Sequence, residues 1–236
     1  MKCLFVSDVH YPISGDIFLK FLWDNYTYFD RIYLLGDIFE FYFGYKNFIY
    51  KHHIKLLTLL KVILKKTELY IFEGNHEYRL EGLRQFMDAH IIKRSLEGKF
   101  NGLRVYMEHG DMVDKEDIRY MMFRNALKNR FTLRIIEHIK PSLLLSLSKK
   151  ASHFSKTDIK SKKSRHTDDA LERFANSKIK SGIDVVILAH THNPILIKKN
   201  NGIYINTGDF LEHFTYATYE TGRGFSLHNY RGDGNG

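Results

Sequence analysis

Short apolar runs alternate with helical patterns along the first part of the chain. Residues 4–6, 32–35 and 69–72 have strand length and are rich in β-branched or aromatic side chains. Between them, residues 17–28 and 48–65 carry apolar side chains at helical spacing. This alternation predicts right-handed β-α-β units and an α/β fold.

Later apolar runs predict more strands. Residues 103–107 and 185–188 are of strand length. Near the end of the chain, shorter strand patterns at residues 202–206, 215–219 and 224–228 are separated by turns that contain glycine. We expect these last strands to form a β-meander.

A long segment, residues 115–181, interrupts this rhythm and is interpreted as a helical insertion. Apolar side chains over residues 121–139 recur at roughly helical spacing, and Pro141 should stop that helix. A second helix should begin with the leucines at 143–147, and a third should cover 167–179 with its first residue as N-cap.

The insertion should lie over the polar loops. It enters just after His109 and leaves just before the strand that leads to His190. The length of 236 residues favours a single domain, residues 1–236, that contains the insertion.

The composition limits the cellular compartments in which the chain is expected. One cysteine, Cys3, excludes a disulfide framework and favours a reducing compartment. No apolar stretch approaches the roughly 20 residues of a membrane span, and the first residues do not read as a secretory signal. We expect a cytoplasmic protein that contacts a membrane at most peripherally.

The net charge of +9 is concentrated in the insertion, because residues 115–180 hold 17 Lys and Arg against 7 Asp and Glu. Such a segment is expected to meet a nucleic acid, an anionic lipid surface or a phosphate-bearing substrate, unless it is only a solvated helical surface. Nucleic acid is the least favoured of these partners, since the segment lacks interleaved exposed aromatics for base stacking.

Polar side chains stand where the predicted strands end. Eight of them share ligand chemistry: Asp8, His10, Asp37, Asn75, His76, His109, His190 and His192. Because ligands bind beyond the carboxyl ends of strands in α/β sheets, we expect these groups to converge. Turn residues would explain single positions, but not so many strand ends in series.

These donors suit a pair of metal ions. A mixed nitrogen and oxygen set fits Mn²⁺ first, with Fe²⁺ or Zn²⁺ as alternatives. A bridging carboxylate would hold two ions roughly 3.5–4 Å apart, the spacing of two-metal hydrolases. Such a site activates water and neutralises phosphoryl oxygens, so the pattern predicts phosphate-ester hydrolysis.

The order of the motifs resembles that of calcineurin-like metallophosphoesterases. The motifs are Asp8-Val9-His10, Gly36-Asp37, Gly74-Asn75-His76-Glu77, His109-Gly110-Asp111 and His190-Thr191-His192. Ala189 stands where the family often has glycine. The resemblance implies a four-layer αββα sandwich with helices outside, here with a helical lid insertion.

The resemblance also implies two ligand groups that share one carboxylate. The first ion would take Asp8, His10, Asp37 and His192, and the second would take Asp37, Asn75, His109 and His190. His76 would face the substrate phosphate beside Asn75 and protonate or stabilise the leaving oxygen, with Glu77 nearby to orient it. The implied catalytic residues are His76, Asp37 and Asn75.

A narrower resemblance concerns the lid. The motif Gly36-Asp37-Ile38-Phe39-Glu40 is similar to the Gly-Asp-x-x-Glu of UDP-2,3-diacylglucosamine hydrolases, and His192-Asn193-Pro194 resembles their ending. Those enzymes carry an Asp-x-x-Tyr-x-x-x-Arg pattern in the lid, which Asp117, Tyr120 and Arg124 match on one helix face.

The narrower resemblance implies a substrate as well. Asp117, Tyr120 and Arg124, with Asn75 and His76, would bind UDP-2,3-diacylglucosamine, whose pyrophosphate would be hydrolysed to UMP and 2,3-diacylglucosamine 1-phosphate. Further phosphate contacts are expected in residues 156–165. The rivals are another phosphodiesterase, a phosphatase or a nuclease of the same superfamily, but a small nucleotide needs no amphipathic lid.

Other polar residues have simpler interpretations. Asp111 either orients His109 or caps the next helix, and Glu40 either supports a ligand or caps. Asp209 is interpreted as a turn residue. Surface or hydrogen-bonded positions are expected for the remaining histidines: His52, His53, His90, His138, His153, His166, His213 and His228.

Overall fold

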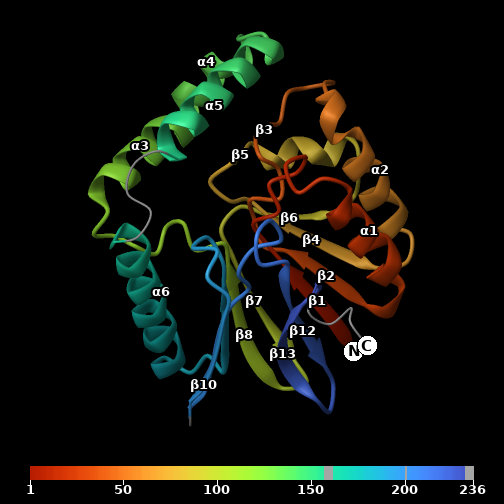
Figure 1. Cartoon of the computed structure of the whole chain (residues 1–236), viewed down its shortest axis with the longest axis vertical. Helices are drawn as coiled ribbons and strands as arrows, with labels where there is room; N and C mark the ends of the chain where they lie inside the picture. Colours follow the sequence, from red (N-terminus) through yellow and green to blue (C-terminus); the bar gives the residue numbers. More distant parts are fainter. Residues whose placement is uncertain (157–161, 200, 232–236) are drawn as a thin grey trace.

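Two β-sheets stacked face to face occupy the centre of the molecule (Figure 1). The computed structural model describes residues 1–156, 162–199 and 201–231. In the first sheet the strand order is β13 (Gly224–Asn229), β12 (Thr215–Glu220), β1 (Lys2–Val6), β2 (Arg31–Leu34), β4 (Glu68–Phe72) and β6 (His90–Ile92). The neighbours from β1 to β6 are parallel, and β12 runs antiparallel to β1.

The second sheet supplies the other half of the sandwich. Its order is β10 (Ile195–Lys199), β11 (Gly202–Asn206), β9 (Val185–Leu188), β8 (Leu103–Glu108) and β7 (Ser95–Phe100). Strand β9 is parallel to both β8 and β11. A short ribbon of β3 (Tyr42–Phe43) and β5 (Glu77–Tyr78) lies apart from both sheets.

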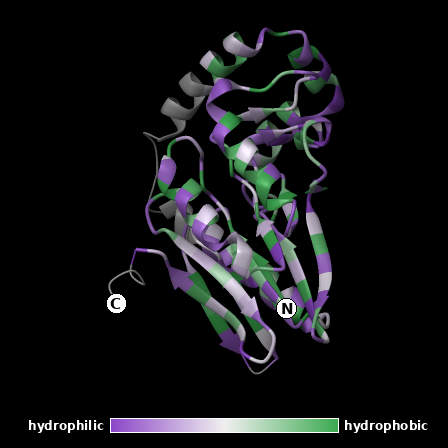
Figure 2. Cartoon of the chain, turned by 90° about the vertical axis from the view of Figure 1, so that its right-hand side faces the viewer, coloured by the Kyte–Doolittle hydropathy of each residue, from purple (hydrophilic) through white to green (hydrophobic). Residues whose placement is uncertain are grey.

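Side-chain alternation explains why the first sheet is covered on both faces. In β1, Leu4 and Val6 point into the core shared with the helices, whereas Cys3 and Phe5 point into the core between the sheets. Figure 2 shows hydrophobic positions repeating along the strands. A strand buried on both faces reads as a continuous apolar run, as the sequence predicted.

Helices cover the two outer faces and complete the αββα layers that the sequence analysis expected. Helices α1 (Asp16–Asn25) and α2 (Ile54–Ile63) pack on the first sheet, and α6 (Lys162–Lys180) packs on the second (Figure 1). The 3-10 turns η1 (Tyr26–Tyr28), η2 (Lys51–His53) and η3 (Leu80–Gln85) extend the connections. The predicted β-α-β alternation is confirmed.

Helices α3 (Ile118–Lys128), α4 (Arg130–Glu137) and α5 (Pro141–Lys156) extend away from the sheets (Figure 1). The single helix expected over residues 121–139 is wrong, because Asn129 takes an extended conformation and its side chain caps α4 at Thr132. Pro141 is the first residue of α5. Thr167 lies inside α6 and is not its N-cap.

The expected terminal meander is also wrong. Strands β12 and β13 form a hairpin in the first sheet, while β11 pairs with β9 in the second. Strand β11 belongs to the second sheet because its other face packs against α6: Ile205 lies in the core between the sheets, whereas Tyr204 packs with Leu171 of α6. Within the residues described, no helix is both long and apolar enough to cross a membrane.

Candidate metal centre

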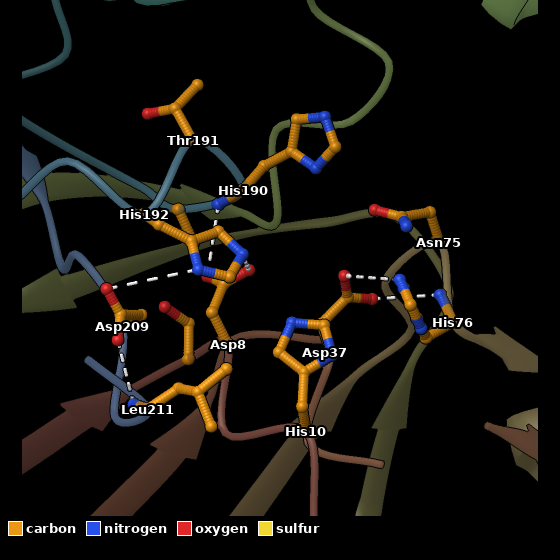
Figure 3. A network of polar contacts seen from close by, with 12 residues as sticks. Asp8, His10, Asp37, Asn75, His76, His190, Thr191, His192, Asp209 and Leu211 are labelled. Atoms are coloured by element: carbon orange, nitrogen blue, oxygen red, sulfur yellow. Dashed lines mark hydrogen bonds and ion pairs between the residues drawn. The ribbon is translucent and has the colours of Figure 1, made fainter. Parts of the chain in front are cut away.

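The loops after β1, β2, β4, β8 and β9 bring the predicted ligands together, and Figure 3 shows those of the loops after β1, β2, β4 and β9. The backbone turns sharply at these strand ends, because several residues with ligand chemistry have positive φ angles: Asp8 (48°), His10 (50°), Asp37 (51°), His190 (76°) and His192 (60°). This left-handed conformation costs an ordinary L-residue roughly 1–2 kcal/mol. The turns aim the side chains at a common point.

Two glycines allow the loops to approach closely. At Gly36 (φ 93°) an added Cβ would lie 2.7 Å from Nδ1 of His109. At Gly74 an added Cβ would collide with the carboxylate of Asp37. Both positions therefore need glycine for space beside the centre.

The first predicted ligand group is assembled around Asp8. Its Oδ1 lies 3.3 Å from Nε2 of His192, and the rings of His192 and His10 are stacked with centroids 5.3 Å apart. One ligand atom from each of these residues lies within 4.8 Å of the others. Oδ1 of Asp8 and Nε2 of His10 are buried without a hydrogen-bond partner among the described residues.

The second predicted group is assembled around His109. Its Nε2 lies 3.5 Å from Oδ2 of Asp37 and 3.2 Å from Oδ1 of Asn75. Ligand atoms of Asp37, His109 and His190 lie within 4.8 Å of one another. Nδ1 of His109 contacts the carbonyl of Leu35 at 2.9 Å, so its Nε2 faces the centre.

This donor set fits divalent metal ions. The buried donors of the first group that make no hydrogen bond among the described residues would each carry a desolvation penalty if nothing bound there. A third set, His10, Asp37 and His76, also has ligand atoms within 4.8 Å. Nitrogen and carboxylate donors without cysteine suit Mn²⁺, Fe²⁺ or Zn²⁺.

The ionisable side chains of the second group shift one another's pKa values. Burial alone would raise the pKa of Asp37, but the adjacent His109 and His76 hold it well below its usual range. Burial also lowers the pKa of His109, and the Asp37 carboxylate outweighs this and raises it to about 10. Burial and the neighbouring His109 lower the pKa of His190 to about 4. The buried carboxylate therefore favours a positive charge beside it.

The histidines are oriented by groups behind them. Oε2 of Glu40 lies 3.1 Å from Nδ1 of His10, so Glu40 orients a predicted ligand, in line with the first of its two interpretations. The carbonyl of Glu40 lies 2.6 Å from Nδ1 of His76. Asp209 accepts the backbone N–H of Leu211 as a turn residue should, and its Oδ2 also lies 3.9 Å from Nδ1 of His192 (Figure 3).

Glu77 has a different task from the one expected. Its carboxylate does not orient the His76 ring but accepts backbone N–H groups of Asp37, Phe39 and Gly74, at 3.0, 3.1 and 2.8 Å. It thereby joins the loop after β2 to the loop after β4. Burial and the Asp37 charge raise the pKa of Glu77 to about 8.

The predicted lid residues contact the loop that follows β8. Asp117 caps α3 by accepting the N–H of Tyr120 at 3.0 Å. The hydroxyl of Tyr120 donates to Oδ2 of Asp111 at 3.3 Å, and Nε of Arg124 pairs with the same oxygen. Asp111 therefore neither orients His109 directly nor caps a helix, but anchors α3.

Two features were missed from the sequence. Lys128 on α3 pairs with Glu73 beside Asn75, a contact that its position four residues after Arg124 could have suggested. His53 is fully buried without a hydrogen-bond partner among the described residues, so its expected surface or satisfied state is wrong. The expected phosphate contacts of residues 156–165 lie outside the side chains that the structure describes.

Comparison with known proteins gives a consistent picture. Residues 1–194 match the family model for calcineurin-like phosphoesterases. The UDP-2,3-diacylglucosamine hydrolase of Blochmanniella pennsylvanica is 28% identical over 218 residues, which cover 84% of this chain and 82% of that protein. The enzyme of the same name from Azotobacter vinelandii is 25% identical over 199 residues, covering 82% and 83%.

A solved structure supports the fold. An archaeal phosphodiesterase superposes with a TM-score of 0.51 and 16% identity, covering 97% of this chain and 99% of its own. At that identity the likeness concerns the arrangement of sheets and helices alone.

Proposed function

Because the chain belongs to the calcineurin-like phosphoesterase family of metal-dependent hydrolases, we propose that it hydrolyses the pyrophosphate of UDP-2,3-diacylglucosamine. The products would be UMP and 2,3-diacylglucosamine 1-phosphate. The observation that carries this proposal is the docking of a basic, amphipathic helix, α3, onto a loop of the metal centre. The relatives named for this activity support it at 25–28% identity.

The proposed metal ligands are those of the two groups described above. The first ion would be held by Asp8, His10, Asp37 and His192, and the second by Asp37, Asn75, His109 and His190. Two divalent ions, for which we propose Mn²⁺, would activate water and neutralise charge on the phosphoryl oxygens. Asp37, buried and anionic, would lie between the two positions.

His76 is proposed to act on the leaving oxygen. A carbonyl only accepts hydrogen bonds, so the contact with Glu40 keeps a hydrogen on Nδ1 of His76. Nε2 is then the atom that faces the centre, 3.9 Å from Oδ2 of Asp37. Protonated there, it would donate to the oxygen that leaves as the pyrophosphate bond breaks, while Asn75 beside it would orient the phosphate.

Residues 115–181 are proposed to form a lid over this centre within one domain. Asp117, Tyr120 and Arg124 would bind the sugar phosphate on the face of α3 that points to the centre. The contacts of Tyr120 and Arg124 with Asp111 support this assignment by showing which way the face is turned. The ring of Tyr120 also lies 6.1 Å from that of His190.

The exposed apolar residues of the lid are proposed to contact the acyl chains and an anionic membrane surface. Large apolar side chains of the lid are exposed by 49–73%: Ile118, Met122, Phe123, Phe131, Ile135, Leu143 and Leu147. Arg130 and Arg134 are exposed on α4 between them. Apolar and cationic groups together match a lipid surface with anionic head groups, which would make the protein a peripheral partner of the cytoplasmic membrane face.

The substrate assignment is tested by kcat/KM with Mn²⁺ for UDP-2,3-diacylglucosamine and for UDP-glucosamine without acyl chains. The acylated compound should be strongly preferred, because remote binding energy of the chains lowers the barrier. Tyr120→Ala and Arg124→Ala should weaken that preference. Equal values would refute the lipid assignment, and faster cleavage of single-stranded DNA or of a simple nucleotide diester would favour the other phosphoesterase activities.

A further inference from the structure

Helix α3 contacts two of the loops that carry proposed ligands of the second group, the loop after β8 and the loop after β4. The contacts come from residues at every fourth position, which share one face of the helix. Tyr120 and Arg124 bind Asp111, two residues after His109. Lys128, one turn further, donates from Nζ to the carbonyl of Gly74 at 2.6 Å and to Oε1 of Glu73 at 3.0 Å.

The contact of Lys128 fixes the peptide that leads into Asn75. The N–H of Gly74 donates to Glu77 at 2.8 Å, and its carbonyl accepts from Lys128. Its Cα is packed so closely against Asp37 that a Cβ would not fit. The loop is therefore held from the core on one side and from the lid helix on the other.

The environment of Lys128 is nearly closed to solvent. Its side chain is 10% exposed and that of Glu73 is 12% exposed, and the Lys128 ammonium also lies 5.2 Å from the centre of the Tyr78 ring. Glu73 is fixed in turn by the N–H of Leu80 at 3.1 Å. Such a pair has a defined geometry, unlike an exposed ion pair.

The first group is held differently. His10 is supported by Glu40, and His192 lies against Asp209, and both supporting residues lie outside the insertion. The two proposed ion positions therefore differ in what holds them. The supports of the first position come from outside α3, and the second depends on the core together with α3.

We propose that Lys128 is a positioning residue through which binding of the second cation depends on the docking of α3. This inference rests on the proposed two-cation function. Lys128 acts through the Gly74 peptide, which places Asn75 opposite His109. Lid and metal occupancy are then coupled, so that a displaced α3 leaves the protein with one cation.

The proposal and the simplest alternative predict opposite effects of removing Lys128 on the affinity for the second cation. If Lys128 were only a nearby charge, removing it would strengthen the binding of a cation, because like charges repel. If it positions Asn75, removing it weakens binding of the second cation. Loss of an outer partner of a metal ligand typically lowers affinity by about 10–100-fold.

The test is a titration of the metal-free full chain with Mn²⁺. Calorimetry measures the affinity of each binding step, and electron paramagnetic resonance detects the Mn²⁺ pair. In Lys128→Met, we expect the second Mn²⁺ to bind about 10–100-fold more weakly. The first should bind as in the unaltered chain, and the spin-coupled signal of a Mn²⁺ pair should appear only at higher Mn²⁺. Lys128→Arg should restore much of the affinity. Arg119→Met, which removes an exposed charge from the same helix, should change neither binding step.

A double variant guards against a folding defect. Lys128→Met with Glu73→Gln leaves no unpaired buried charge, and circular dichroism reports whether it folds. The same loss of second-site affinity is expected. Second-site binding that is unchanged or tighter in a folded variant would overturn the role of Lys128 while leaving the two-cation function intact. An unaltered chain that binds a single Mn²⁺ would overturn both.

Discussion

His76 reaches the metal centre from the loop after β4, with its ring fixed by the Glu40 carbonyl. If it donates a proton to the leaving oxygen, His76→Ala should lower kcat by about 10²–10⁴-fold, the usual contribution of a general acid. Steady-state kinetics measures this change, and elemental analysis should find the Mn²⁺ content preserved. Loss of metal together with rate would instead make His76 a ligand, as its proximity to His10 and Asp37 allows.

His53 illustrates a different use of histidine, as a neutral member of the core. It packs against Phe39, Tyr42 and Tyr50, and burial lowers its pKa from 6.5 to about 3. In the unfolded chain His53 is protonated below about pH 6.5, whereas in the folded chain it stays neutral down to about pH 3. Stability from this residue is therefore lost as the pH falls through that window, by about 2 kcal/mol at pH 5.

The expected consequence is a smaller acid sensitivity in His53→Phe. The free energy of unfolding, measured with urea at pH 7 and pH 5, should fall less in this variant than in the unaltered chain. His138→Gln, at an exposed position at the end of α4, should keep the original difference. An unchanged difference in His53→Phe would show that His53 does not set it.

The convergence of the predicted ligand residues could be expected because each follows an apolar run that ends at the same edge. The burial of His53 could not be expected, since nothing in Lys51-His52-His53 distinguishes the buried ring from the half-buried one beside it. Burial here is decided by Phe39 and Tyr42, which come from the segment between β2 and η2. Such tertiary surroundings leave no local pattern.

At the scale of elements, the loop after β4 is held by close packing against the loop after β2 as well as by hydrogen bonds. Gly74→Ala would push a methyl group into the Asp37 carboxylate. We expect a loss of activity of about 10²–10³-fold, comparable to the loss of one electrostatic stabiliser. Gly98→Ala on β7 is the matched control, because its Cβ would meet the Phe100 ring at 3.4 Å. Near-normal kinetics in Gly74→Ala would contradict this packing.

The sequence predicted helices and strands best where one apolar periodicity continued and no side-chain cap interrupted it. Strands β1, β2, β4, β8 and β9 are apolar runs, and α1 and α2 lie between strands as expected. The break at Asn129 was hidden because apolar spacing continues across it, while the side-chain cap that makes it is local and polar. The partner of β11 depends on which core it completes, which the turn residues do not specify.

For the whole molecule, bound cations should contribute to stability. A ligand at 100 times its Kd stabilises the folded state by about 2.7 kcal/mol. For a domain of this size each kcal/mol shifts Tm by about 2–4 °C, so a strong chelator should lower Tm by about 5–10 °C relative to excess Mn²⁺. Differential scanning calorimetry measures the shift, and Asp8→Asn should reduce it. A Tm that is indifferent to chelator would argue against high-affinity ions.

The left-handed turns at Asp8, His10, Asp37, His190 and His192 also bear on how this chain changes over generations. Glycine, and to a smaller extent asparagine, adopts these φ angles at a lower free-energy cost, so the native residues slightly destabilise the folded state. A descendant released from metal chemistry would gain stability by replacing them and should accumulate glycine and asparagine at these positions. The retention of aspartate and histidine there would thus indicate, in any related genome, a lineage in which hydrolysis is still under selection.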